Sequence, residues 1–267
     1  MAGRLEDLSS ARQRVVERLE DLSFARLVPS ILTLLGLCCG ATAIRFALSK
    51  DWRHAVAAIV AAMVFDMLDG RAARLFGADT RFGAQLDSLV DLVSFGVAPA
   101  VIVFLWSLNG MGEAGWIAAL IYCACSAIRL ARFNIQSASA RDEGATQANP
   151  FFTGLPMPAA AFLAVLPMLL SFQFGDRAVR DPAFTSIIVV LASVLMVSRL
   201  PTPSIKYMRL PRHHRAMAFA GFGAFVILLI NWPWATLTIG FLLYTASIPM
   251  GLIRREQADA PPPEEQA

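Results

Sequence analysis

The sequence predicts an all-α fold, a polytopic bundle of transmembrane helices, on three observations. Hydrophobic residues make up 57% of the 267 positions, whereas charged residues make up only 16%. In soluble domains the charged share is about a quarter. Several apolar stretches are continuous over roughly the 20 residues that a helix needs to cross a bilayer, and the strict alternation of β-barrel strands is absent.

The predicted elements follow one another as a polar segment, about eight spans and a polar tail. Residues 1–26 repeat Arg-Leu-Glu-Asp-Leu-Ser, and we expect either a helix on the membrane surface or a partly ordered tail. Residues 255–267 contain Pro-Pro-Pro-Glu-Glu, which is typical of a disordered cytoplasmic tail. Between them lies a membrane-embedded catalytic domain, 27–254, with spans at 28–48, 53–76, 83–107, 114–134, 155–174, 184–200, 215–231 and 235–253.

The connections between these spans carry the polar and helix-breaking residues. A short turn around Gly77 to Arg81 reverses the chain between the second and third spans, and a polar loop runs from Gln136 to Phe152. Gly154, with the prolines that follow it at 156 and 158, is expected to delay the start of the fifth helix.

The basic residues predict the orientation of the spans. If the N-terminus is cytoplasmic, 18 of the 23 Lys and Arg residues fall on the cytoplasmic side and five on the other. Cytoplasmic loops are enriched in Lys and Arg. We therefore expect both termini in the cytoplasm.

Four aspartates stand within otherwise apolar helices: Asp66, Asp69, Asp87 and Asp91. A carboxylate at membrane depth costs a few kcal/mol, so four of them require a compensating partner. Residues three or four apart share a face of a helix, and the turn between the two helices allows the two acidic faces to oppose each other. The arrangement predicts a membrane-embedded site for divalent cations.

Carboxylate oxygens are hard ligands that suit Mg²⁺ or Mn²⁺. Two such ions can clamp a diphosphate during an in-line displacement, and a further carboxylate can deprotonate an attacking alcohol. Gly70, Ala73 and Gly83 are small enough for a ligand to approach closely, and Arg74 is suited to pair with phosphate. This pattern predicts transfer of a phosphoryl group from a diphosphate donor to a hydroxyl.

The segment Asp66-Met-Leu-Asp69-Gly-Arg-Ala-Ala-Arg74, followed after eight residues by Gly83-Ala-Gln-Leu-Asp87-Ser-Leu-Val-Asp91, resembles the CDP-alcohol phosphotransferase signature at every fixed position. The resemblance implies a six-helix membrane fold, usually dimeric, here with two further helices. It also implies that Asp66, Asp69 and Asp87 bind two Mg²⁺ or Mn²⁺ ions and that Asp91 is the general base and also touches a metal. The residues implied for the nucleotide and diphosphate are Gly70, Ala73, Arg74 and Gly83.

Further segments between Pro29 and Tyr207 resemble the bacterial membrane-integral phosphatidylserine synthases. They are Ser94-Phe-Gly-Val-Ala-Pro99, Arg129-Leu-Ala-Arg-Phe-Asn134, Phe152-Thr-Gly-Leu-Pro-Met-Pro-Ala-Ala-Ala161, Met196-Val-Ser-Arg199 and Pro203-Ser-Ile-Lys206. The implied reaction joins CDP-diacylglycerol and L-serine to give phosphatidylserine and CMP. Leu92 stands where glycerol-phosphate enzymes often have Lys, which disfavours that acceptor.

Serine would bring a carboxylate and an ammonium group to the site. Arg129 and Arg132 are candidates for the carboxylate, with Asn134 as a polar neighbour, although each arginine is equally explained as a positive-inside anchor or a lipid-phosphate contact. Arg199 and Lys206 are weaker candidates for the phosphates of the donor.

Related enzymes often have Pro-Asn-x-x-Thr in the first span, where this chain has Pro29-Ser-Ile-Leu-Thr33. We keep Thr33 as a candidate for the nucleotide site.

Two other functions fit parts of the pattern. A sister enzyme could use inositol phosphate, glycerol phosphate or choline as acceptor, and a divalent-cation transporter would also place acids in the membrane. The transporter explains neither the spacing of the small residues nor a site near the cytosol.

The expected partners are CDP-diacylglycerol, L-serine, membrane lipids and a second copy of the chain, with no nucleic acid. The expected location is the bacterial inner membrane, with the active site facing the cytoplasm.

Overall fold

The computed structural model describes residues 27–77, 80–142, 151–198, 201–203, 215–243 and 245. They form two compact units that divide between Ala98 and Pro99, and each unit is described by itself. The predictions for segments 1–26 and 255–267, and for Arg199 and Lys206 as phosphate contacts, lie outside the described residues.

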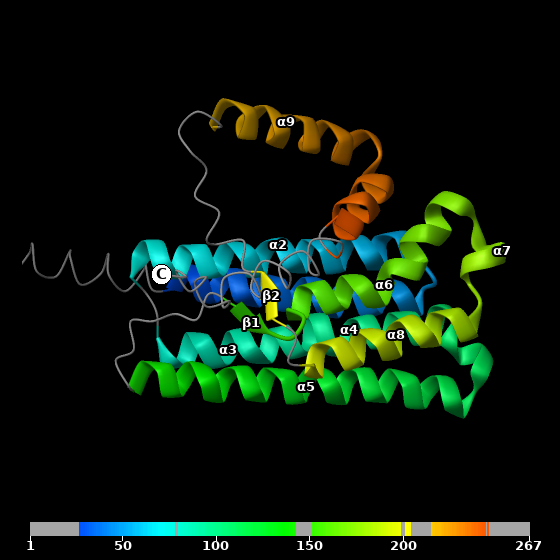
Figure 1. Cartoon of the computed structure of the whole chain (residues 1–267), viewed down its shortest axis with the longest axis horizontal. Helices are drawn as coiled ribbons and strands as arrows, with labels where there is room; N and C mark the ends of the chain where they lie inside the picture. The colour runs from blue at the N-terminus through cyan, green and yellow to red at the C-terminus, as the bar shows by residue number, and fades with distance from the viewer. Residues whose placement is uncertain are drawn as a thin grey trace, which may run out of the picture. The chain divides into compact units, whose positions relative to one another are not determined.

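The first unit consists of helices that follow one another along the chain, the last two without a break (Figure 1). They are the helix Leu27–Leu48, α2 (Trp52–Phe76), α3 (Arg81–Asp91) and the π-helical segment η1 (Leu92–Val97). The Asp51 carboxylate accepts from the His54 N–H at the start of α2, and Gly77 ends that helix in the left-handed conformation at φ 57°. Thr80 then caps α3 by accepting from the Gly83 N–H at 2.9 Å. One acidic helix thus ends and the other begins on the two sides of the predicted turn, of which residues 78–79 lie outside the described residues.

Close backbone approach holds the first unit together along the helix Leu27–Leu48. A Cβ added at Gly36 would lie 3.6 Å from Phe65 Cβ in α2 and 3.7 Å from Val90 Cγ1 in α3. Further along, small and aliphatic side chains are buried on both helices: Ala43, Ala47, Ala55, Val56 and Ile59. Small residues at helix contacts let backbones approach closely, which is the usual way in which membrane helices pack.

The second unit carries the remaining helices and a short strand pair. Its elements are α4 (Ala98–Trp106), η2 (Leu108–Met111), α5 (Glu113–Asp142), β1 (Phe151–Thr153), α6 (Met157–Phe174), α7 (Asp176–Val179), α8 (Pro182–Val197), β2 (Pro201–Pro203), α9 (Arg215–Asn231) and the helix Pro233–Leu243. Helix α8 packs against both α5 and α6 (Figure 1).

The predicted spans coincide with described helices, although several differ at their ends; α8, for example, ends at Val197 rather than at the predicted residue 200. Helix α5 continues to Asp142, eight residues past its predicted end, and the last helix is described only to Leu243. Among the described residues, four helices are long and apolar enough to cross a membrane, namely Leu27–Leu48, Phe82–Trp106, Glu113–Gln136 and Met157–Phe174. The protein is therefore a helical membrane protein, and the count of eight spans stays a prediction.

The described residues agree with the all-α prediction, and the one addition among them is a pair of three-residue strands. Strand β1 pairs antiparallel with β2, with Phe151 opposite Pro203 and Thr153 opposite Pro201. Next to it, a Cβ added at Gly154 would lie 2.7 Å from the Met196 carbonyl oxygen, and Leu155 donates to the Leu195 carbonyl at 3.1 Å. The pair forms because the start of α6 lies against the end of α8. Strands of three residues are too short to show a periodicity in the sequence.

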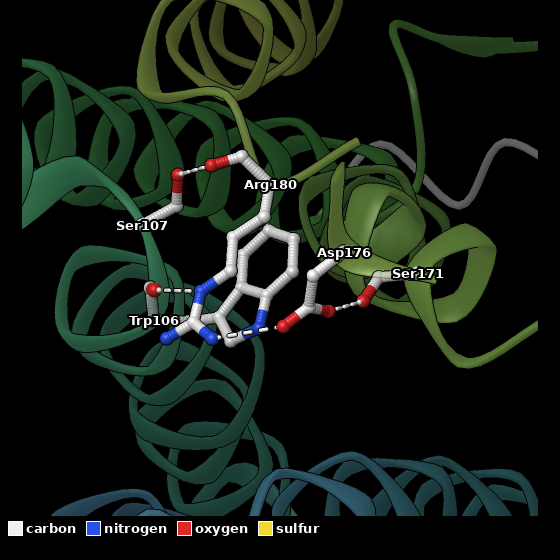
Figure 2. A network of polar contacts seen from close by, with 5 residues as sticks. All are labelled: Trp106, Ser107, Ser171, Asp176 and Arg180. Atoms are coloured by element: carbon white, nitrogen blue, oxygen red, sulfur yellow. Dashed lines mark hydrogen bonds and ion pairs between the residues drawn. The ribbon is translucent and has the colours of Figure 1, made fainter. Parts of the chain in front are cut away.

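A polar network lies at the other end of the second unit and connects residues at the end of α4, in α6 and at α7 (Figure 2). Arg180 donates from Nε to the Trp106 carbonyl at 3.0 Å and from a terminal nitrogen to Asp176 at 3.0 Å, and its guanidinium lies 5.6 Å from the centre of the Trp106 ring. Ser171 donates to Asp176, and Ser107 donates to the Arg180 carbonyl at 3.1 Å. Hydrogen bonds from Ser171 and then Arg180 hold the pKa of the Asp176 carboxyl below its usual value.

Candidate active site and metal centre

Three of the four aspartates converge within the first unit. Carboxylate oxygens of Asp66, Asp69 and Asp87 all lie within 4.8 Å of one another. Asp66 and Asp69 come from the C-terminal half of α2, and Asp87 comes from α3 across the Gly77 turn. Asp69 is buried and the other two are half-buried. The convergence expected from helix periodicity is thus present for these three aspartates.

The cluster fits the divalent ions that the sequence implies. Three carboxylates so close together repel one another unless a cation or protons neutralise them. Ionised carboxylates are acceptors only, and Mg²⁺ and Mn²⁺ favour such oxygen ligands. Asp66, Asp69 and Asp87 could therefore hold metal, and the identity and number of the ions stay predictions.

Asp91 stands at the C-terminal end of α3, one turn beyond Asp87. At 1.5 Å per residue the two backbone positions are about 6 Å apart along the helix. Asp91 is half-buried and lies outside the cluster formed by the other three carboxylates. A neighbouring carboxylate outside the ligand cluster suits a general base, although its roles as base and as metal ligand both stay predictions.

Thr33 lies beside the cluster rather than apart from it. Its side chain is 5% exposed, its hydroxyl donates to the Pro29 carbonyl at 2.9 Å, and it interacts with the Asp69 carboxylate. The sequence singled out Thr33 only as a nucleotide contact. The structure adds a contact with a candidate metal ligand, which the local sequence could not indicate because the two residues are far apart in the chain.

The small residues of the signature differ in exposure and in the space around them. Gly70 is exposed, and no described atom lies within 4 Å of a Cβ added there. Ala73 is half-buried, while Arg74 is exposed in the last turn of α2. Gly83 has a second role, because a Cβ there would lie 3.1 Å from Thr80 Oγ1 and press on the cap of α3. The space at Gly70 agrees with the close approach of a ligand predicted from the sequence, and the role of these residues in nucleotide binding stays a prediction.

The candidates for serine binding lie on α5, in the second unit. Arg132 donates to the Val197 carbonyl at 2.9 Å, at the C-terminal end of α8, where a cation also complements the helix dipole. Arg129, three residues earlier, is half-buried and Asn134 is exposed. The contact with Val197 gives Arg132 a structural role that the sequence did not predict. The proposed contacts of these three residues with serine stay predictions.

Comparison with known proteins supports the assignment that the residues indicate. Residues 26–198 match the family model described as CDP-alcohol phosphatidyltransferase, and residues 214–249 match the model described as CDP-alcohol phosphatidyltransferase 2. The first match contains all four aspartates and every candidate of the nucleotide site.

Three similar proteins carry the name CDP-diacylglycerol--serine O-phosphatidyltransferase. The one from Mycobacterium leprae is 37% identical over 229 residues, which is 85% of this chain and 75% of the relative. That from Helicobacter pylori is 35% identical over 181 residues, covering 67% of this chain and 73% of the relative. That from Bacillus subtilis is 34% identical over 179 residues, covering 67% and 91%. The chain therefore belongs to the CDP-alcohol phosphatidyltransferase family.

Proposed function

We propose that this protein is a CDP-diacylglycerol–serine O-phosphatidyltransferase, which transfers the phosphatidyl group of CDP-diacylglycerol to the hydroxyl of L-serine and releases CMP. The observation that carries the proposal is the convergence of Asp66, Asp69 and Asp87 in a fold of this family. The names of the similar proteins from Mycobacterium leprae, Helicobacter pylori and Bacillus subtilis support serine as the acceptor.

Asp66, Asp69 and Asp87 would hold two Mg²⁺ or Mn²⁺ ions, which when bound offset the negative charge of the diphosphate and of the departing CMP. Asp91 takes the proton from the serine hydroxyl. The serine oxygen then forms a bond to the β-phosphorus, and the bond from that phosphorus to the bridging oxygen of CMP breaks. Arg74 pairs with the diphosphate, and Gly70, Ala73, Gly83 and Thr33 border the nucleotide.

The acceptor would be recognised through its carboxylate by Arg129 and Arg132, with Asn134 nearby. A guanidinium has five N–H donors, so the contact of Arg132 with Val197 and a contact with serine are compatible. Arg199 and Lys206 would bind donor phosphate. In this sequential mechanism both substrates bind before the phosphatidyl group is transferred directly to serine, and no side chain serves as a covalent nucleophile.

The donor would enter from the bilayer, with its acyl chains in lipid and its nucleotide in the cytosolic cavity. The excess of basic residues on the side of the N-terminus supports a site that faces the cytoplasm of a bacterial inner membrane. The protein would act as a homodimer, as is usual in the family.

The test is purified protein with CDP-diacylglycerol and labelled serine, with Mg²⁺ or Mn²⁺ and after removal of metal by a chelator. We expect phosphatidylserine and CMP in equal amounts, formation that stops on chelation and recovery when either ion is restored. Mass spectrometry of parallel reactions with glycerol phosphate, inositol phosphate and choline identifies a different acceptor.

Two outcomes would contradict the proposal. One is divalent-cation uptake into proteoliposomes without consumption of CDP-diacylglycerol, which would indicate a transporter. The other is release of CMP and labelling of the protein by the phosphatidyl group before serine is added, which would replace the sequential path by a covalent one.

A further inference from the structure

The helix that carries Asp87 and Asp91 changes its hydrogen bonding immediately after Asp91. Residues Leu92–Val97 form the π-helical segment η1, and the Ala98 N–H donates to the Val93 carbonyl five residues earlier. Such segments are rare, and many lie at functional sites. Proline at position 99 has no N–H to donate, which favours a departure from α-helical bonding just before it. This segment contains most of the Ser94–Pro99 motif, to which the proposed mechanism gives no role.

Ser94 connects the π-helical segment to the helix Leu27–Leu48. Its side chain is fully buried, and its hydroxyl donates to the Gly36 carbonyl at 3.3 Å. A buried hydroxyl without a partner would be unfavourable, so this bond favours one particular setting of the two helices. Asp87, Asp91 and Ser94 are spaced four and three residues apart, so they fall near one face of the helix.

Gly40 makes this contact possible. A Cβ added at Gly40 would lie 2.8 Å from both the Cα and the Cβ of Ser94, and closer still to its hydroxyl oxygen. Heavy atoms at that distance clash, and a backbone Cα cannot move aside without moving its helix. The absence of a side chain at Gly40 thus determines how closely η1 packs against the helix Leu27–Leu48.

The same face of the helix Leu27–Leu48 reaches both acidic helices. Gly36 lies against Phe65 and Val90, the residues that directly precede Asp66 and Asp91. Thr33 interacts with Asp69. One helix therefore contacts α2 and α3 beside their aspartates, so a shift at Gly40 and Ser94 changes the distance between the carboxylates of α2 and those of α3.

We propose that Ser94, seated against Gly40, is a positioning residue that fixes α3 so that Asp87 and Asp91 face the carboxylates of α2. The roles of Asp87 as metal ligand and Asp91 as base rest on the proposed function. Ser94 acts through these aspartates and contacts neither substrate.

The test compares Gly40→Ala and Ser94→Ala with Gly240→Ala, a matched control in a helix where no described atom lies within 4 Å of an added Cβ. For each variant in detergent we would measure thermal unfolding, kcat and KM for both substrates, and Mn²⁺ affinity without substrate by electron paramagnetic resonance. A misplacement of about 1 Å can lower a rate about 100-fold. We expect Gly40→Ala to lower kcat by roughly 10- to 100-fold and to weaken Mn²⁺ binding, with a much smaller change in the KM for CDP-diacylglycerol.

Ser94→Ala keeps the packing volume and removes one hydrogen bond, so we expect a loss of about 5-fold in kcat together with weaker Mn²⁺ binding. Adding Ser94→Gly to Gly40→Ala removes the Cβ and hydroxyl that clash, and should recover part of the Mn²⁺ affinity. Gly240→Ala should match the wild type. A folded Gly40→Ala protein with unchanged kcat and Mn²⁺ affinity would overturn the inference. If Gly40→Ala does not fold, unchanged values for Ser94→Ala overturn it.

The Mn²⁺ measurement separates this inference from the proposed function. If the wild type makes no phosphatidylserine, the proposed function fails, while the relative Mn²⁺ affinities still decide whether Ser94 and Gly40 position the carboxylates. If the wild type is active and all variants equal it in both measurements, only the positioning role fails.

Discussion

Asp91 has the same side chain as the other three aspartates but lies outside their cluster. Asp66, Asp69 and Asp87 form the cluster, and Asp91 stands one turn further along α3, next to the π-helical segment. A residue placed beside a metal site is suited to hold or take a proton. Single substitutions can therefore separate the proposed base from the proposed ligands.

Asp91→Asn keeps the size of the side chain and removes its ability to accept a proton. We expect serine transfer to fall about 10²- to 10⁴-fold, the usual contribution of a general base, with most of the Mn²⁺ binding retained. The measurement is the rate of labelled phosphatidylserine formation at saturating metal. The matched control is Glu113→Gln, at an exposed carboxylate at the start of α5, which should leave the rate unchanged. Full activity of Asp91→Asn would refute the assigned role.

Thr33 is the residue for which the structure changes the expectation most. Thr33→Val keeps the shape of the side chain but loses the hydroxyl that interacts with Asp69, whereas Thr33→Ser keeps the hydroxyl. A hydrogen bond contributes about 1 kcal/mol net, so we expect Thr33→Val to weaken Mn²⁺ activation about 5-fold and Thr33→Ser to remain near the wild type. Equal behaviour of both variants in a Mn²⁺ titration of activity would show that the hydroxyl does not support Asp69.

Among the elements, the end of α4 is joined to α7 by polar contacts of Arg180, and α6 joins the same network through the bond from Ser171 to Asp176 (Figure 2). The guanidinium meets the last carbonyl of α4 and the carboxylate of Asp176, and the Arg180 carbonyl accepts from Ser107. A cation at a helix C-terminus is favoured by the helix dipole. This network is structural and belongs to the end of the second unit opposite the strand pair.

The network predicts a pH dependence of stability. Because the pKa of Asp176 is held below its ordinary value of 3.8, first by Ser171 and then by Arg180, its ionised form is stabilised by folding. This contribution to folding stability is complete when the pH is above the ordinary pKa. It is lost as the pH falls through the lower pKa of the folded protein. We expect the thermal midpoint of the wild type in detergent to fall more steeply below about pH 4 than that of Asp176→Asn. Parallel curves for the two proteins would contradict this assignment.

At the scale of the whole molecule, the distribution of charge predicts on which side of the membrane the site lies. If both termini are cytoplasmic, as the sequence predicts, 18 of the 23 Lys and Arg residues lie on that side and the turn at Ser49 and Lys50 lies on the other. The helices alone do not distinguish the two directions of insertion, because reversal exchanges the sides and leaves the hydropathy unchanged.

Cysteine labelling tests the orientation directly. In a chain whose four native cysteines are replaced by alanine, Ser49→Cys and Gln266→Cys each supply one thiol for a membrane-impermeant maleimide. We expect Ser49→Cys to react in intact cells and Gln266→Cys to react only after the inner membrane is permeabilised. The opposite pattern would place the aspartates on the outer side, away from cytosolic nucleotide, and would contradict the proposed donor path.

The amino-acid sequence by itself determined the helical membrane class, the approximate positions of the helices and the four carboxylates from which the cluster of three is formed. Continuous hydropathy and the spacing of Asp66, Asp69 and Asp87 are local properties, and helix periodicity converts them into faces. Only the tertiary structure decided that Thr33 meets Asp69, that Ser94 is seated against Gly40, that Arg132 meets Val197 and that β1 pairs with β2. Each of these contacts joins residues dozens of positions apart, so it depends on how closely whole helices pack, which no local pattern encodes.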